Sequence, residues 1–321
     1  MRVTTAGQTQ ALITRLQANA QQLERAQLRV TTGKRIERMS DDPTAGAVVM
    51  QASSGLRGVA QYARNVDRVG ASLDAADAAM EQLSDLLGRA KELGITGNSA
   101  NTGPAARVAV ANGLRAIFDQ VVSIGNTKIG DEYLFGGLTN DGRAPFDAGA
   151  DAFVASDPPP AGSPPGTLAV PRFPDGTRTV EVGAGGQRLL GAHDGTTLFL
   201  GRRPDGTPDP TTGALPALRA LEQAMRTDDA PGIAAALTAL DDAFAGLQGN
   251  VGELGARQNS ADTVKAGLAA LDTTLTEQRA DLSEVDAAQA IAEMMARQTA
   301  YQAAMLASSK VMGMSLVDYL R

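Results

Sequence analysis

Side chains capable of acid–base, nucleophilic or metal chemistry are scarce in this sequence. There is no cysteine, which excludes disulfides, thiolate metal sites and cysteine nucleophiles. His193 is the only histidine, so a Ser–His–Asp triad would have to use it. Its setting, Gly191-Ala192-His193-Asp194-Gly195, is typical of a turn. We predict an exposed loop histidine, and we identify no catalytic residue, no cofactor site and no metal ligand.

Two further motifs superficially resemble functional sites. Asp41 and Asp42 could form a carboxylate pair, but they directly precede Pro43, an arrangement typical of a helix start. The run Gly183–Gly186 is glycine-rich like a phosphate-binding loop, but it lacks the Lys-Ser/Thr pair that follows in such loops. We therefore predict a helix cap at the first motif and a hairpin or loop at the second.

The composition favours long helices that pack closely side by side. The 321 residues are 43% hydrophobic but only 3% aromatic. The net charge is −7 and the only dense basic stretch, residues 33–38, is short, so we expect no nucleic-acid partner. No apolar run approaches the roughly 18 residues that span a membrane, and residues 1–10 lack the apolar region of a signal peptide. We therefore expect no membrane insertion.

Apolar residues repeat at helical spacing through the first 140 residues. The first seam ends at Gly33 and runs, in steps that fit a heptad repeat, through Leu12, Leu16, Leu23 and Val30. A second seam covers residues 56–90, and a third follows Pro104 and ends before the glycine pair at residues 136–137. These seams predict long helices that pack lengthwise against other helices.

The middle of the sequence has a different character. Twelve of the 15 prolines lie between residues 145 and 216. Turn signals there separate short β-like runs, namely Thr167–Val170, Arg178–Val182, Arg188–Leu190 and Thr197–Leu200. We predict a small β-rich insert, with a proline-rich loop at residues 157–166.

Helical patterning returns at about Leu215 and continues almost to the C-terminus. We predict separate helices on either side of Gly249-Asn250, the second carrying a late seam of Met294, Tyr301, Met305, Met312 and Leu316. Methionine at this spacing suits either a core or an adaptable interface. We favour an assembly interface built from this seam and the N-terminal one, because neither helix can bury its apolar stripe alone.

These patterns predict a mainly α fold, a long coiled-coil-like helical bundle from both chain ends with a small β-rich inserted domain. We expect residues 1–40 and 285–321 to form terminal helical assembly segments. Residues 41–140 and 215–284 are expected to form a helical rod domain. Residues 141–214 are expected to form the variable β-rich insert.

Several motifs, in order along the chain, resemble those of the bacterial flagellin family, in particular its hook-associated branch. The matching segments are residues 31–36 and 40–43, 126–128 and 133–137, 282–291, and 315–320. The residues that carry the motifs are Gly33, Arg35, Ile36, Ser40, Asp41, Asp42, Pro43, Tyr133, Phe135, Gly136, Gly137, Asp318, Tyr319 and Leu320.

The resemblance implies a structural subunit that joins hook to filament in the bacterial flagellum, and not an enzyme. It implies export through the flagellar type III route and a place in the secreted, extracellular part of the flagellum. The partners that it implies are further copies in a ring, the longer hook–filament junction protein, flagellin and a flagellar export chaperone. For the insert it implies only an outward-facing position.

Other functions remain open from the sequence. A small filament flagellin would share the terminal seams, although residues 41–43, 133–137 and 318–320 favour the junction. A secreted binding module could display residues 141–214, but aromatic residues are not clustered there. An enzyme would need a convergent set of polar residues in a pocket, and the sequence does not indicate one.

Overall fold

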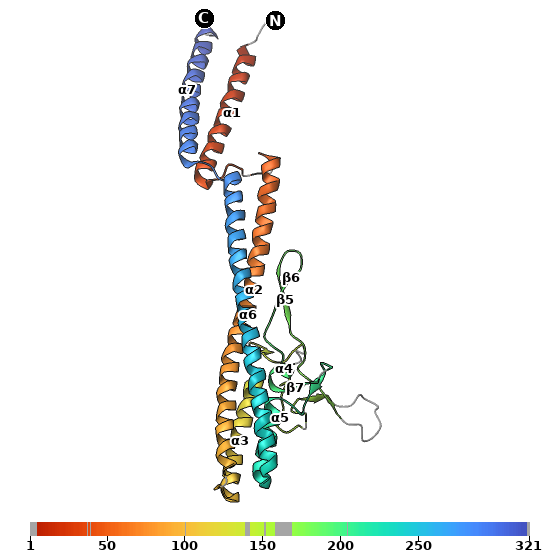
Figure 1. Cartoon of the computed structure of the whole chain (residues 1–321). Coiled ribbons are helices and arrows are strands. Elements are labelled where there is room, and N and C mark those ends of the chain that lie inside the picture. Colours follow the sequence, from red (N-terminus) through yellow and green to blue (C-terminus); the bar gives the residue numbers. More distant parts are fainter. Residues whose placement is uncertain are drawn as a thin grey trace, which may run out of the picture. The chain divides into compact units, whose positions relative to one another are not determined.

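The fold is mainly α, as predicted, with long helices and short antiparallel strand pairs (Figure 1). The computed structural model describes residues 5–36, 38, 40–99, 101–138, 142–150, 152–157, 169–203 and 205–319. Side chains are described from residue 10 onward in the N-terminal helix and up to residue 309 in the C-terminal helix. The chain divides into two compact units, Met1–Ala60 with Ala270–Arg321 and Gln61–Ala269.

The helices are α1 (Thr5–Thr32), α2 (Pro43–Gly97), α3 (Pro104–Gly125), α4 (Gly195–Phe199), α5 (Ala214–Thr227), α6 (Ala230–Ser283) and α7 (Ala287–Tyr319). The strands form four antiparallel pairs. They are β1 (Lys128–Ile129) with β2 (Glu132–Tyr133), β3 (Ser156–Asp157) with β4 (Val170–Pro171), β5 (Thr179–Gly183) with β6 (Gln187–Leu190), and β7 (Gly201–Arg202) with β8 (Pro208–Asp209).

The start of α2 confirms the predicted helix cap. Pro43 occupies the first helical position, and Asp42 Oδ1 accepts the backbone N–H of Ala45 at 3.0 Å. This bond satisfies one of the N–H groups that the first turn of a helix leaves unpaired. The carboxylate of the adjacent Asp41 accepts the backbone N–H of Arg38 at 2.9 Å.

The predicted break at Gly249-Asn250 is wrong, because α6 continues through both residues. Leu247 and Leu254, on either side of them, are fully buried. Burial of these two side chains favours the helix more than one glycine and one asparagine disfavour it, which illustrates how packing overrides local propensity.

The described part of the insert docks on the helices of its unit through a buried aromatic cluster. Phe135, which precedes the insert, lies 5.3 Å from Phe199 between ring centroids, and Phe146 lies 5.0 Å from Phe199. All three side chains are buried. The carboxamide of Asn126, at the end of α3, pairs with both the backbone N–H and C=O of Phe146 at 3.0 Å. These contacts fix the insert against the rest of its unit. The sequence predicted only an outward-facing position for it.

The β-like runs have mixed outcomes. Residues 178–182 and 188–190 fall largely in β5 and β6, and the glycine-rich run forms the end of β5 and the turn of that hairpin at residues 184–186, as predicted. The prediction of a strand at residues 197–200 is wrong, because α4 occupies most of it. Asp194 caps this helix by accepting the N–H of Thr197 at 2.8 Å. Within the predicted run at residues 167–170 and the predicted loop at residues 157–166, residues 158–168 lie outside the described residues.

His193 is buried, with only 3% of its surface exposed, so the prediction of an exposed loop histidine is wrong. The loop that carries it packs against α6, where Arg257 Nη1 donates to the carbonyl oxygen of Gly191 at 2.7 Å. His193 Nε2 lies 4.0 Å from Glu253 Oε2. Burial lowers the pKa of His193, and the positive charge of Arg257 lowers it further.

Acid should therefore destabilise the fold through His193. Because its folded pKa lies below the ordinary value of 6.5, the unfolded chain binds more protons in the interval between the two values, and stability falls as pH drops through it. The variant His193→Gln should flatten the slope of unfolding free energy against pH by up to about 1.4 kcal/mol per pH unit. Urea titrations between about pH 7.5 and 5.5 measure the slope. An unchanged slope would contradict the account.

A second prediction concerns the glycine at which the chain turns into the insert. Gly137 has a φ of +61°, and an added Cβ would lie 2.4 Å from the carbonyl oxygen of Asp175. Gly130 has a similar φ of +60° but open space around it. Gly130→Ala should cost about 1–2 kcal/mol of stability, from the backbone alone. Gly137→Ala should cost at least about 2 kcal/mol more, because the backbone must also move.

Denaturant unfolding of both variants measures this difference directly. Equal losses of stability in Gly130→Ala and Gly137→Ala would show that the close approach to Asp175 contributes nothing.

Candidate functional site

The two terminal helices, α1 and α7, lie side by side and antiparallel within their unit, so that both chain ends emerge at the same end of the pair (Figure 1). Arg29 Nη1 contacts Glu293 Oε2 at 3.3 Å, and Arg297 Nη1 donates to Gln22 Oε1 at 2.6 Å. These contacts are exposed, so they fix the register of the helix pair but contribute little to its stability. The close approach is made by small residues, since Ala26 and Ala290 are buried.

The predicted interface residues fall into two groups on these helices. Most of those described are half-buried, namely Leu12, Leu16, Leu23, Val30, Met294 and Tyr301. On α7, Met294 and Tyr301 share an arc of about 60° with Ala290 and Arg297, the side that contacts α1. Met305 lies at the edge of this arc and is 49% exposed. The side chains of Met312, Leu316, Asp318 and Tyr319 are outside the described set, and Leu320 lies outside the described residues.

Of a second apolar band on α7, the sequence analysis recognised only Met305. The band consists of large side chains that are 40–70% exposed, namely Ile291, Met295, Met305 and Leu306. At 100° per residue they lie within an arc of about 100° next to the side that contacts α1. Leu28 and Ile13 of α1 are likewise exposed, at 42% and 40%. Several of these residues directly follow a seam position in the sequence. Such adjacent apolar pairs indicate an apolar face wider than one seam, and this pattern could have revealed the band.

The N-terminal motif lies in a joint where two chain segments pair. Gly33, with a φ of +67°, ends α1, and its carbonyl oxygen accepts the N–H of Val285 at 3.0 Å. The N–H of Arg35 donates to the carbonyl oxygen of Ser283 at 2.7 Å. The joint thus links the α1–α2 connection to the α6–α7 connection by backbone hydrogen bonds, which any sequence compatible with the geometry can form.

Arg35 adds side-chain contacts to both halves of this joint. One guanidinium nitrogen donates to the carbonyl oxygen of Leu282 at 2.8 Å, and another lies 3.5 Å from Asp42 Oδ2. Asp286, on the other segment, accepts the N–H of Ala288 at 2.8 Å and so caps α7. The family motif residues of segments 33–43 and 282–286 therefore form one cluster. Ile36 is half-buried there and Ser40 is exposed.

The second motif, residues 133–137, lies in the other unit and seats the insert. The carbonyl oxygen of Phe135 accepts the N–H of Gly195 at 3.0 Å. Gly195 must be small, because an added Cβ would lie 2.6 Å from that oxygen. The side chain of Arg178 donates to the carbonyl oxygen of Gly137 at 2.8 Å. The contacts of this motif hold the insert in place.

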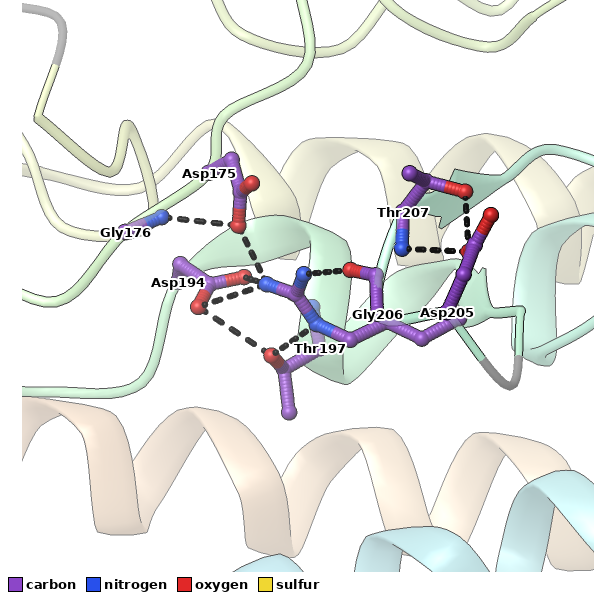
Figure 2. Close-up of polar contacts among 8 residues, drawn as sticks. Asp175, Gly176, Asp194, Thr197, Asp205, Gly206 and Thr207 are labelled. Atoms are coloured by element: carbon purple, nitrogen blue, oxygen red, sulfur yellow. Dashed lines mark hydrogen bonds and ion pairs between the residues drawn. The ribbon is translucent and has the colours of Figure 1, made fainter.

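An arginine-centred polar cluster locks the insert internally. Figure 2 shows Asp175 and Asp194 converging on one guanidinium group, that of Arg202. Arg202 also donates to the carbonyl oxygen of Gly206 at 2.7 Å, and Asp175 accepts the N–H of Gly176 at 2.9 Å. The hydrogen bond that Arg202 donates to the Asp175 carboxylate raises the pKa of Arg202. Every charge is paired, which is typical of a structural clamp.

Among the described residues there is no group of three or more His, Cys, Asp or Glu side chains placed to hold a metal ion. In the same part of the chain, no helix combines the length and the apolar character needed to cross a membrane.

Comparisons with known proteins agree with the two motif clusters. The bacterial flagellin N-terminal helical region matches residues 3–139, and the bacterial flagellin C-terminal helical region matches residues 237–320. Flagellar hook-associated protein 3 of Escherichia coli K12 is 25% identical over 300 residues, which are 89% of each chain.

Solved structures show the same fold. A putative flagellar hook-associated protein from Vibrio parahaemolyticus superimposes with a TM-score of 0.61 at 19% identity, over 76% of this chain and 100% of that one. The flagellar junction protein FlgL from Legionella pneumophila gives 0.52 at 12% identity, over 74% and 100%. The two flagellin regions together cover more than half of the chain, and they include both motif clusters. The chain is therefore a member of the bacterial flagellin family and a structural subunit of the bacterial flagellum.

Proposed function

We propose that this subunit joins the hook to the filament and that it does so by packing its terminal helices against neighbouring subunits. The observation that carries the proposal is the apolar band on α7, whose members stay 40–70% exposed although α1 lies alongside. Exposed apolar side chains that line one face of a helix mark an interaction surface. Association would remove them from water, at about 25 cal/mol for each Å² of apolar surface buried.

The relatives favour the junction over the filament. The match to a flagellar hook-associated protein 3 extends over nine tenths of both chains, whereas the flagellin regions alone would suit a filament subunit equally well. The name of the Legionella relative describes a junction protein. The proposal requires no catalytic step, since the surface offers packing and no reactive group.

Several finer features belong to the same proposal. The subunit leaves the cell through the flagellar type III route and acts in the extracellular part of the flagellum. It forms a ring with its own copies, with the longer junction protein on the hook side and flagellin on the filament side. An export chaperone would cover the terminal segments before secretion, because the same exposed apolar band would otherwise promote premature association.

Cells that lack this chain test the place of the subunit. We expect hooks without filaments under the electron microscope, together with flagellin shed into the medium, because the filament would have no surface on which to start. Restoring the gene should restore filaments. A mutant that lacks filaments but sheds no flagellin would contradict the junction and favour a filament subunit instead.

A charge in the apolar band tests the proposed mechanism. Met305→Asp should reduce the fraction of cells with attached filaments about tenfold or more, because an unpaired charge buried at an interface costs several kcal/mol. Leu316→Asp should act in the same way if the stripe continues along α7. Secreted amounts must be measured together with filament attachment, so that failed export is not mistaken for failed assembly.

Two matched changes serve as controls. Ala300→Asp introduces the same charge at an exposed residue on the side of α7 opposite the apolar band and should leave attachment intact. Deletion of residues 158–166 should also be tolerated, because loop closure entropy changes slowly with length. This deletion spares Asp157, which pairs with Arg143 and Arg172 at 3.0 and 3.1 Å. Normal filaments on cells that secrete Met305→Asp would refute the mechanism.

A further inference from the structure

One segment of α6 is unusually poor in helix-forming residues. Gly246, Gly249, Gly252 and Gly255 recur at every third position, and Asn250 lies among them. A Cβ added at any of these glycines would meet no atom within 4 Å. Packing within the chain therefore does not require glycine at these positions. Each glycine weakens the helix relative to alanine, because it leaves the unfolded backbone more freedom.

The core holds this segment at only a few points. Leu247 and Leu254 are buried, at 2% and 0% exposure, but they lie about two helical turns apart. Val251, between them, is only half-buried. Further contacts come from the loop of the insert that precedes α4.

The insert contacts α6 just beyond the C-terminal end of this segment, at Arg257. Its Nη1 donates to the carbonyl oxygen of Gly191 at 2.7 Å, and its Nη2 donates to Glu253 Oε1 at 2.7 Å. The Arg257 side chain is 11% exposed, so these bonds are largely shielded from water. His193 is buried beside them, within reach of both Glu253 and the backbone of Asn250.

We propose that residues 246–255 of α6 form a latent hinge, which the docked insert keeps in helical form. Because the segment has weak helix propensity, local opening costs little free energy. The contacts from Gly191 and His193 raise the free energy of that opening. The insert then stabilises the helical form of the segment, and loss of its contacts would allow α6 to unwind locally at the glycines. This inference rests on packing within residues 61–269 and does not depend on the place of the subunit in the flagellum.

Amide hydrogen exchange on the full-length chain tests the hinge. Arg257→Ala removes the bond to Gly191, and we expect exchange across residues 246–255 to accelerate about tenfold or more while α3 stays protected. Replacing Gly246, Gly249, Gly252 and Gly255 by alanine in the same variant should return exchange in this segment to within about threefold of the wild type. The four alanines in the wild-type background should slow exchange there, which tests the hinge even if Arg257→Ala folds poorly.

A second set of glycines provides the matched control. Gly58, Gly70, Gly88 and Gly267 also lie in long helices and also have open space around an added Cβ. Alanine at these four positions should not restore protection at residues 246–255. The proposal is overturned if Arg257→Ala leaves the segment protected, if α3 loses protection equally, or if the control alanines rescue as well as the hinge alanines.

Discussion

The pairing of α1 with α7 brings together residues as far apart in sequence as Gln22 and Arg297, a separation of 275 positions. Two helices in contact bury only one side of each other, and here the contact side is built around the small residues Ala26 and Ala290. The helices therefore approach closely but leave large apolar side chains in water. A pair of this kind is only marginally stable in isolation. We propose that neighbouring flagellar subunits cover the exposed band.

The joint at residues 33–35 and 282–285 makes this pairing possible. Backbone hydrogen bonds hold the two interhelical connections next to each other, so the chain leaves α1 and enters α7 at adjacent points. Arg35 reinforces the joint by contacts to Leu282 and Asp42. The described motif residues of this joint therefore hold the two interhelical connections in place. At Gly137, in the second motif, the backbone passes too close to Asp175 for a side chain.

Local signals predicted much of this structure, and tertiary packing accounts for the errors. The heptad seams, the cap at Asp42 and the turn at residues 184–186 each depend on a few neighbouring residues, so a single sequence reveals them. The continuity of α6 depends on burial of Leu247 and Leu254. The helix at residues 195–199 depends on a capping aspartate that also belongs to the Arg202 cluster. The burial of His193 depends on Arg257, 64 positions away in sequence. No local pattern encodes contacts of these kinds.

We propose that the terminal helices obtain their missing partners only from other subunits. Amide hydrogen exchange measured for the dilute subunit and for the assembled junction tests it most directly, because exchange reports the free energy of local opening. We expect residues 1–40 and 285–321 to exchange rapidly in the dilute subunit and to become protected on assembly, while residues 104–125 stay protected in both states. Full protection of the terminal helices in the dilute subunit, with no change on assembly, would contradict the account.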